Sequence, residues 1–413
     1  MRLSGRTITV WRWKMAEQVA YACVEEAKVQ AFLYPIVDAP IGFRGGPVLT
    51  DPAQQRLRHH RNSAPYDHFQ ADTAYDDRLS GDYYYAGPLY DHFGHFLSEM
   101  VHRIVSAHHH GAGYPLLFIS TRETPTPADI ETAASYIQDI LHFLGIDAGN
   151  SVVIRRNTIV ERLHVFEQGA CWGGHPKASY LDRLAAFSGD RLDQICGAVE
   201  RPKKIYVSRS ALPKLGSILG EEYFERILHE EGFTVFRPEN HPFAVQMDHY
   251  RKADTIVFAE GSAAHGTELL GSRMMGTVVL VPRSPQAYVF ERVLQPRSRR
   301  FIRANVTRYL GTVKENPSDG SPLFHRGVSI MRPQITVQTF RENGISPMRR
   351  FSSTAYLKAA VADLRRYWDE AKRIPEPFNR RYAASLARNL AFGWMEGDGV
   401  SRKALREGEK TGC

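Results

Sequence analysis

The sequence predicts an α/β protein with two core-forming domains, and three observations support this prediction. The first is the length of 413 residues, which exceeds the usual size of a single domain. The second is an alternation of buried-strand and amphipathic-helix patterns over residues 204–282, which is typical of a parallel sheet covered by helices. The third is a weaker alternation of the same kind over residues 82–199.

Composition narrows the classes of protein that fit. Hydrophobic residues make up 43% and charged residues 24% of the chain, as in ordinary globular proteins. No apolar run approaches the roughly 20 residues of a membrane span, and Arg2, Arg6 and Arg12 interrupt the region that a secretory signal needs to be apolar. We therefore expect a cytoplasmic protein. Four scattered cysteines without a Cys-x-x-Cys pair predict reduced thiols, and neither a disulfide framework nor a zinc site.

The formal net charge of +8 leaves several anionic partners open. A basic protein attracts nucleic acid, anionic membrane surfaces and phosphorylated small molecules. The basic residues are widely spread and match no common nucleic-acid-binding motif, so nucleic acid is not expected. Peripheral contact with the inner face of a membrane stays open, and so does the oligomeric state.

The first half of the chain divides into two predicted segments. Residues 1–80 read as an N-terminal extension of short strands and loops, because short apolar pieces alternate with Pro, Gly and Asp. Residues 81–200 read as an α/β domain with helices over Phe93–Ser106, Ala128–Leu144, Lys177–Phe187 and Arg191–Val199, and strands over Pro115–Ser120 and Ser151–Phe166. The histidine run 108–110 is placed in a loop without a necessary role.

The second half begins with the clearest pattern of the chain. Residues 201–295 predict strands over Lys204–Ser208, Phe233–Phe236, Thr255–Ala259 and Thr277–Pro282, and helices over Glu221–Glu231, Pro242–Lys252 and residues 262–270. Right-handed crossovers would place these strands in a parallel sheet. Residues 296–413 are basic, and two amphipathic helices, Ala355–Ile374 and Tyr382–Phe392, are expected to pack back on the domains, with a solvated tail as the alternative.

The first candidate site is the turn after the predicted strand TIVFA. Gly261, Ser262 and Ala263 are small, so an anionic ligand could approach the backbone, and the N-terminus of the following helix would supply free N–H donors. The ordinary alternative is that Ser262 only caps the helix. Glu260 and Glu268 are expected to bind ribose or sugar hydroxyls, because carboxylates repel phosphates.

The second candidate site is Arg209, directly after the predicted strand KIYVS. The carboxyl ends of parallel strands meet at one sheet edge, so Arg209 could bind a diphosphate in bidentate fashion there. An arginine in a surface loop is the ordinary alternative. The chain contains no Asp-x-Asp pair, which agrees with neutralisation of a diphosphate by arginine and a helix dipole.

The third candidate site is a group of polar side chains spaced three or four residues apart in the predicted helix near residue 95. One of His92, His95 and Glu99 could serve as general base for an acceptor hydroxyl. Glu99 and His102 also form a Glu-x-x-His pair of the kind found in di-iron bundles. A metal-dependent hydrolase built on these four residues is therefore one alternative function.

Four segments together resemble glycosyltransferase family 61, whose bacterial members include capsular-polysaccharide biosynthesis proteins. They are YDHFGHFLSEMVHRI (residues 90–104), KIYVSRS (204–210), EEGFTVFRPE (230–239) and AVQMDHYRKADTIVFAEGSAAH (244–265). The resemblance implies a GT-B architecture, with two Rossmann-like domains facing a cleft. It also implies an inverting, metal-independent hexosyl- or pentosyltransferase without a cofactor. Its donor is expected to be a nucleotide-sugar, usually UDP-linked, and its acceptor a glycan or glycolipid.

The resemblance also assigns residues to the site. Family motif positions are matched by His95, Phe96, Glu99, Arg103, Arg209, Glu221, Gln246, Gly261 and Ser262. Their places in the first and third candidate sites add Ala263 and His265 to donor binding, and Asp91, together with Arg103, to the acceptor side. The family often has an Arg and an Asn just before the Glu that matches Glu221, where this chain reads LGSILGE. Because that departure removes one phosphate or sugar contact, a non-catalytic nucleotide- or glycan-binding relative is the other alternative.

Overall fold

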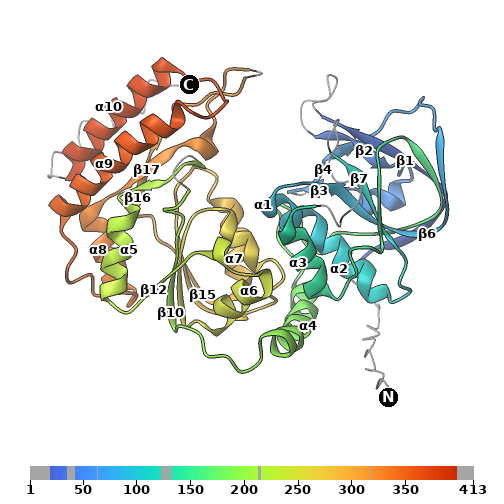
Figure 1. Ribbon diagram of the computed structural model, residues 1–413, viewed down its shortest axis with the longest axis horizontal. Coiled ribbons are helices and arrows are strands. Elements are labelled where there is room, and N and C mark those ends of the chain that lie inside the picture. Colours follow the sequence, from blue (N-terminus) through green and yellow to red (C-terminus); the bar gives the residue numbers. More distant parts are fainter. Residues whose placement is uncertain are drawn as a thin grey trace, which may run out of the picture. The chain divides into compact units, whose positions relative to one another are not determined.

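The computed structural model shows a mixed α/β protein with several sheets (Figure 1), which confirms the predicted α/β class. The described residues are 19–34, 42–62, 64–121, 130, 133–212, 215–317 and 319–397; the residues that bear on a secretory signal, 1–18, lie outside them. The chain divides into two compact units. Unit 1 comprises Met1–Val199, His241–Asp248 and His265–Met274, and unit 2 comprises Glu200–Asn240, His249–Ala264 and Met275–Cys413. The predicted divisions after residues 80, 200 and 295 stay predictions.

Unit 1 contains a seven-stranded sheet with the order β5-β2-β1-β9-β6-β7-β8. Its strands are β1 (Tyr21–Leu33), β2 (Phe43–Pro47), β5 (Asp67–His68), β6 (Asp77–Leu89), β7 (Leu116–Ser120), β8 (Ser151–Ile154) and β9 (Thr158–Phe166). Strands β9, β6, β7 and β8 are parallel, whereas β1 is antiparallel to β2 and β9. A separate short hairpin joins β3 (His60–Arg61) to β4 (Ala64–Pro65).

Strand β1 differs from the short strands and loops expected before residue 80. It is 13 residues long and pairs with β9 from Tyr21 opposite Phe166 to Val29 opposite Thr158. Charged residues interrupt its apolar residues, so the sequence lacks the period-two pattern of a strand. In the structure the strand is also irregular at Glu26, which has a positive φ of 50°. Pairing with β9 forms the strand where local pattern does not show it.

The helices of unit 1 include α2, which packs on β6 and β9, and η2, which packs on β6. They are α1 (Phe93–His95), the π-helical turn η2 (Phe96–Met100), α2 (Val101–His110), α3 (Ser135–Leu144) and α4 (Ala178–Cys196), preceded in the chain by the 3₁₀ helix η1 (Pro52–Leu57). The histidine run 108–110 is the last turn of α2 and not a loop, because the helix ends only at the left-handed Gly111. One continuous helix, α4, replaces the two predicted there. Ser188, which lies between the two predicted helices, is buried and donates to the carbonyl oxygen of Leu269.

Unit 2 contains the predicted parallel sheet, with the order β12-β10-β13-β14-β15. Its strands are β10 (Lys204–Val207), β12 (Thr234–Phe236), β13 (Thr255–Ala259), β14 (Met275–Val281) and β15 (Ser298–Arg303). The first four confirm the predicted strands. The helices around them are α5 (Glu221–Glu230), α6 (Phe243–Lys252), η6 (Ser262–Thr267) and α7 (Tyr288–Arg297), with the short turn η5 (Pro238–Asn240) before α6. The division between the two units runs through α6 and η6.

One helix of this region was predicted wrongly. An α-helix is expected over residues 262–270, but the structure has η6, a 3₁₀ helix of six residues. Glycine lowers helix propensity, and Gly266 and Gly271 stand within and just after the segment. A side chain at Gly271 would overlap the backbone of Ala185, so close packing against α4 also fixes the path of this segment.

The described part of the basic C-terminal segment contributes to the core of unit 2. A small sheet of β11 (Ile218–Leu219), β17 (Val328–Met331) and β16 (Thr307–Gly311) precedes α8 (Pro333–Glu342), α9 (Ser353–Ala371) and α10 (Arg380–Gly397), with η7 (Phe324–Arg326) between β16 and β17. Helix α9 packs on α5 and β11, and α10 packs on β16. Tyr356, Tyr367 and Leu386 are buried in the same cluster as β10 and β13 residues, so these helices are not a solvated tail.

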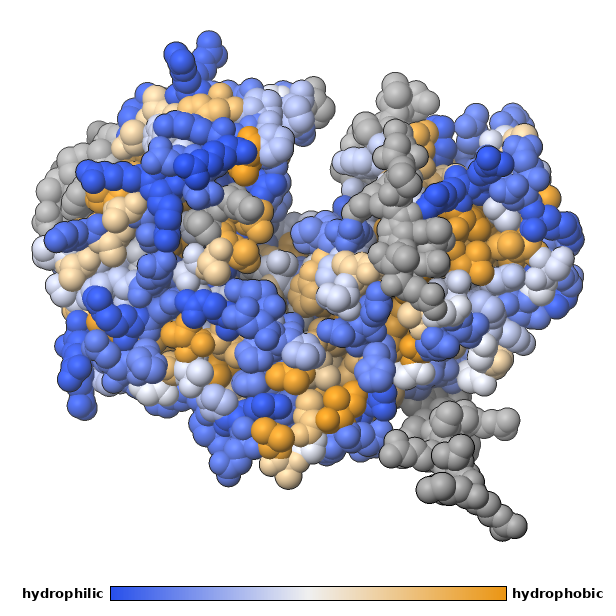
Figure 2. Space-filling view, viewed as in Figure 1, coloured by the Kyte–Doolittle hydropathy of each residue, from blue (hydrophilic) through white to orange (hydrophobic). Residues whose placement is uncertain are grey.

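The described surface is mainly polar where unit 2 is visible in Figure 2. There, hydrophilic residues cover most of the face, and apolar residues form small separate groups. Among the described helices, none combines the length and the apolar character that a membrane-crossing segment requires.

Candidate functional site

The candidate donor site lies in unit 2, at the carboxyl end of the parallel sheet. From β10 the chain adds β12 on one side and later β13 on the other side. The direction of winding changes between β10 and β13, and open α/β sheets bind ligands at such a switch point. Arg209 follows β10, and Gly261 follows β13. The structure therefore brings two of the predicted phosphate-binding turns to the switch point.

Arg209 is fixed by backbone carbonyl groups and keeps unused donors. Its Nη2 donates to the carbonyl oxygens of Leu215 at 3.2 Å and Gly216 at 3.0 Å, while its Nε has no partner. Burial, together with the charge of Arg283, lowers the pKa of Arg209 to about 10. A side chain at Gly261 would overlap the Arg209 guanidinium. An arginine with unused N–H groups thus lies against bare backbone, an arrangement suited to a phosphate.

Glu221 lies beneath the same turn, at the first position of α5. Its Oε1 accepts hydrogen bonds from the Arg209 backbone N–H at 2.8 Å and from the Tyr206 hydroxyl at 3.1 Å, while its Oε2 has no partner. Burial raises the pKa of Glu221 to about 7, although the hydrogen bond and charge of Arg209 act in the opposite direction. Glu221 therefore supports the turn that carries Arg209.

Glu260 supports a neighbouring turn. Its carboxylate accepts hydrogen bonds from the backbone N–H groups of Arg283 at 2.5 Å and Ser284 at 2.8 Å, and from the Ser284 hydroxyl at 2.5 Å. These bonds hold the chain just after β14. The oxygens of Glu260 thus already have protein donors. The predicted contact of Glu260 with ribose or sugar hydroxyls stays a prediction.

The turn after β13 is open but does not start an α-helix. Ser262 and Ala263 are half-buried next to the buried Gly261, and η6 is too short for the helix dipole that the sequence predicted. The predicted anion binding at this turn therefore depends on Arg209 and on the small residues.

The candidate catalytic group lies in unit 1 around Glu99, which is fully buried. Its Oε1 accepts a hydrogen bond from Nδ1 of His95 at 2.5 Å, and its Oε2 accepts one from Nε2 of His59 at 2.9 Å. Arg61 donates Nε and Nη2 to the two oxygens at 2.8 and 2.9 Å. Burial acts to raise the pKa of Glu99, but the hydrogen bonds of His59 and His95 and the charge of Arg61 hold it well below its usual range.

This arrangement leaves His95 with the geometry of a general base. A carboxylate on Nδ1 holds the imidazole in the tautomer whose Nε2 can accept a proton. The His95 side chain is 35% exposed, whereas the His59 side chain is 1% exposed. Of the residues bound to Glu99, His95 is the histidine that solvent or substrate can reach.

Sequence reasoning missed His59 and Arg61. They lie 40 and 38 positions before Glu99 in the chain, so no local spacing connects them with it. Arg61 also lies over the rings of Tyr66 at 3.9 Å and Trp172 at 5.6 Å, which fixes its guanidinium. Only the tertiary structure reveals that the buried carboxylate has a cationic partner.

The other predicted acceptor-side and catalytic residues have different surroundings. His92 is exposed and caps α1, with Nδ1 accepting from the His95 backbone N–H at 3.4 Å. Asp91 is exposed and accepts from the Tyr136 hydroxyl at 3.2 Å. Arg103 is buried, and it donates to the carbonyl oxygens of Leu57, Phe166 and Arg58. Arg103 therefore ties η1 to β9, and its contact with an acceptor stays a prediction.

The four-residue metal group of the alternative hydrolase does not form. Glu99 binds Arg61, His59 and His95, whereas His102 binds the Tyr180 hydroxyl at 2.9 Å and Glu268 at 3.1 Å. Within the described ranges, no group of three or more His, Cys, Asp or Glu side chains is arranged to hold a metal ion. The pairing of Glu99 with His102, on which that hypothesis depended, is thus contradicted.

Three predicted donor-binding residues group with unit 1. Glu268 links two histidines, since its Oε2 accepts from His102 and its Oε1 from Nδ1 of His265 at 3.0 Å. Gln246 donates to the carbonyl oxygen of His241 at 2.9 Å, and its buried Oε1 has no partner among the described residues. Their roles in donor binding stay predictions.

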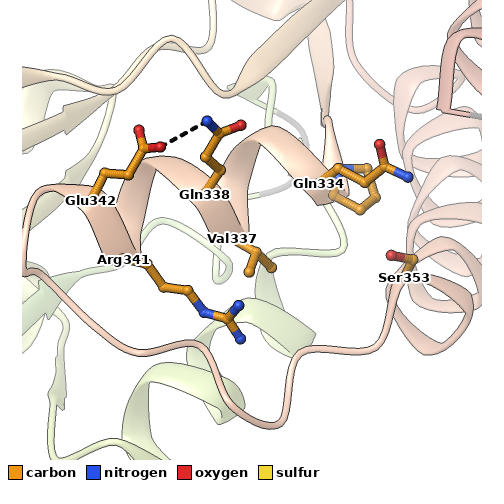
Figure 3. A pocket seen from close by; sticks show the side chains of 7 residues that line it. Gln334, Val337, Gln338, Arg341, Glu342 and Ser353 are labelled. Carbon is orange, nitrogen blue, oxygen red and sulfur yellow. Dashed lines mark hydrogen bonds between the residues drawn. The ribbon is translucent and has the colours of Figure 1, made fainter. Parts of the chain in front are cut away.

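A groove elsewhere in unit 2 is not the candidate site. It measures about 460 Å³ and lies along α8 near the start of α9 (Figure 3), lined by Pro333, Gln334, Val337, Gln338, Arg341, Glu342 and Ser353. Its charged groups are already engaged, because Glu342 accepts from Gln338 at 2.8 Å and Arg341 donates to the Pro347 carbonyl at 2.6 Å. None of the predicted site residues lines it.

A carboxylate-oriented histidine and an arginine at a sheet switch point fit the class of glycosyltransferases, and comparison with protein families supports this class. One family model matches residues 93–280, and its description is Glycosyltransferase 61. The match supports the family that the sequence motifs resemble. It includes His95, Glu99 and Arg209, and it ends before Arg283. No match was found among curated proteins.

Proposed function

We propose that the protein is an inverting, metal-independent glycosyltransferase that moves a sugar from a nucleotide-sugar to a hydroxyl of a glycan or glycolipid. The observation that supports it most is the buried Arg209, with a free Nε, beside the bare backbone of Gly261 at the switch point. A UDP-linked hexose or pentose is the proposed donor, on the strength of the family resemblance. The GT-B arrangement of two Rossmann-like domains is part of the same proposal.

The proposed chemistry is a direct displacement. The acceptor oxygen attacks the anomeric carbon, and its proton passes to Nε2 of His95, which Glu99 orients through Nδ1. The bond from the anomeric carbon to the diphosphate oxygen breaks, and its electron pair stays on that oxygen. Arg209 stabilises the charge that develops there. No metal ion or cofactor takes part in this proposal.

The proposed cellular setting follows from the resemblance alone. Family members of the capsular type act in cell-surface polysaccharide synthesis, and a nucleotide-sugar donor is a cytoplasmic metabolite. We therefore propose a bacterial, cytoplasmic role in capsule or other surface polysaccharide synthesis, with peripheral contact to the inner face of the membrane through basic surface residues.

Two assays on the full chain test this function. A thermal-shift panel of UDP, GDP, CMP, their sugars and divalent metals should show stabilisation by one nucleotide diphosphate, because a ligand of the folded state raises Tm. The stabilising nucleotide-sugar is then supplied with glycan acceptors, and Arg209→Ala and His95→Ala should each lower the transfer rate by about 100-fold or more. Arg300→Gln, an exposed change on β15, is the matched control.

Each outcome has a defined meaning. Nucleotide binding without transfer would favour a non-catalytic relative. Transfer at a normal rate by Arg209→Ala would refute the proposal that Arg209 stabilises the leaving diphosphate. A rise in Tm with metal alone that is abolished in Glu99→Ala would favour the metal-dependent hydrolase.

A further inference from the structure

Arg283, the residue two positions after the last residue of β14, is a second buried guanidinium close to Arg209. Only 6% of Arg283 and 8% of Arg209 are exposed. The charge of Arg283 is among the causes that lower the pKa of Arg209. Both residues contact Gly216, since Arg209 donates to its carbonyl oxygen, and a side chain at Gly216 would overlap Nη1 of Arg283. Two like charges therefore lie together at the carboxyl end of the parallel sheet.

In the described part of the chain, both guanidiniums donate to backbone carbonyl oxygens and neither forms an ion pair with a carboxylate. Arg283 donates Nη1 to the carbonyl oxygens of His325 at 3.2 Å and Gly327 at 3.0 Å, and Nε lies 3.5 Å from the carbonyl oxygen of Glu260. The Glu260 carboxylate is occupied by backbone N–H groups and a hydroxyl. The charges of Glu221 and Glu260 act to raise the pKa of both arginines, but neither carboxylate accepts a hydrogen bond from a guanidinium in the described part of the chain. The pair therefore keeps N–H donors that a further anion could use.

Arg103 shows how the same chain surrounds a buried arginine with backbone acceptors. It is a single charge, it donates to three carbonyl oxygens, and it lies over the Tyr85 ring at 5.2 Å. Arg209 differs because its Nε has no partner. Arg283 differs because its Nη2 has no acceptor among the described residues. The pair keeps donors for a ligand, where Arg103 uses its donors on the fold.

Two glycines, Gly216 and Gly261, lie next to the two guanidiniums. Gly216 has a φ of +81°, a conformation that favours glycine, and a side chain at Gly216 or Gly261 would overlap Arg283 or Arg209, respectively. Bare backbone next to two guanidiniums gives room for an anion to approach both. Two charges with several N–H donors match the oxygens of two linked phosphates better than those of one.

We propose that Arg283 binds the donor's diphosphate together with Arg209, so that the site recognises a nucleoside diphosphate and discriminates against a nucleoside monophosphate. This inference deepens the proposed function and depends on it for the identity of the ligand. It adds a residue outside the segment that matches the family. The two arginines hold the leaving group by its two phosphates.

Calorimetric titration of the full chain tests the inference with three probes: UDP, UMP and inorganic pyrophosphate. Arg283→Gln should weaken UDP and pyrophosphate binding by about 10- to 100-fold, the usual effect of losing charge-assisted hydrogen bonds. UMP binding should weaken less, so the ratio of UDP to UMP affinity falls. Arg283→Lys should restore part of that ratio, because it keeps the charge. Arg300→Gln is the control for a lost surface charge.

The readouts separate this inference from its rivals. If Arg283 only anchors the 325–327 segment, Arg283→Gln lowers Tm and leaves the UDP to UMP ratio unchanged, which overturns the inference. If Arg283→Gln does not fold, Arg283→Lys decides, and an unchanged ratio there is the refuting result. If the wild-type chain binds no diphosphate, the inference is refuted. If it binds UDP through Arg283 but transfers no sugar, the inference stands and the transferase function falls.

Discussion

Replacement of Glu221 by Gln is the most decisive perturbation of stability in unit 2. The Glu221 carboxyl group is buried with one oxygen unpartnered, and burial raises its pKa to about 7, compared with 4.5 for an ordinary glutamate. Gln keeps the shape and the acceptor for the Arg209 N–H and the Tyr206 hydroxyl. It cannot ionise, so the change isolates the cost of the buried charge.

The direction of the pH effect follows from proton binding. Between pH 4.5 and about 7 the folded chain holds a proton on Glu221 that the unfolded chain releases. The stability of the wild-type protein therefore falls as pH rises through this interval. A pKa difference of about 2.5 corresponds to about 3 kcal/mol at about 1.4 kcal/mol per pKa unit.

The expected result is a stability difference that depends on pH. Relative to wild type, Glu221→Gln should gain about 3 kcal/mol between pH 4.5 and pH 8, or about 6–12 °C in the Tm of unit 2, at about 2–4 °C per kcal/mol. Thermal and urea unfolding at both pH values measure it. Glu222→Gln is the matched control, because Glu222 is the exposed neighbour on the same helical turn. A difference between Glu221→Gln and wild type that is the same at pH 4.5 and pH 8 would refute the reasoning.

Three further substitutions test the two sites. Glu99→Gln should destabilise unit 1 by about 3–5 kcal/mol in urea unfolding, because it breaks a buried ion pair, and an unchanged midpoint would contradict the importance of the Arg61 contact. Gly261→Ala should weaken UDP binding by about 10-fold or more in calorimetry, since its methyl group would displace the Arg209 guanidinium; unaltered affinity would show that the ligand binds elsewhere. Arg103→Met should lower Tm without changing the apparent KM for the acceptor, and a raised KM would return Arg103 to the acceptor side.

Local sequence pattern predicts the helices and strands whose buried side chains recur at regular spacing along the chain. The strands of unit 2 are short apolar runs bounded by turns, and the helix near residue 95 has apolar side chains at helical spacing, so both follow from residues near each other in the chain. The pairing of His95 with Glu99 was also predictable, because residues four apart in a helix lie on one face. Arg209 was predictable from its place after a buried strand.

Arg283 could have been found by the same reasoning. It follows the predicted strand TVVLVP just as Arg209 follows KIYVS, and the carboxyl ends of parallel strands share one sheet edge. Its proximity to Arg209 was not predictable, because it depends on the order of the strands in the sheet, which the sequence pattern does not give. In the structure, β13 lies between β10 and β14. The glycine at 216 that contacts both arginines comes from a third segment.

The sequence by itself determined the α/β class, the parallel sheet of unit 2 and the candidate roles of His95, Glu99 and Arg209, since each depends on spacing along the chain. Only the tertiary structure decided which charges meet. Glu99 faces Arg61 and not His102, strand β1 forms through pairing with β9, and Arg209 lies beside Arg283. The physical reason is that a buried charge or an irregular strand is stabilised by partners distant in sequence, and local periodicity contains no information about them.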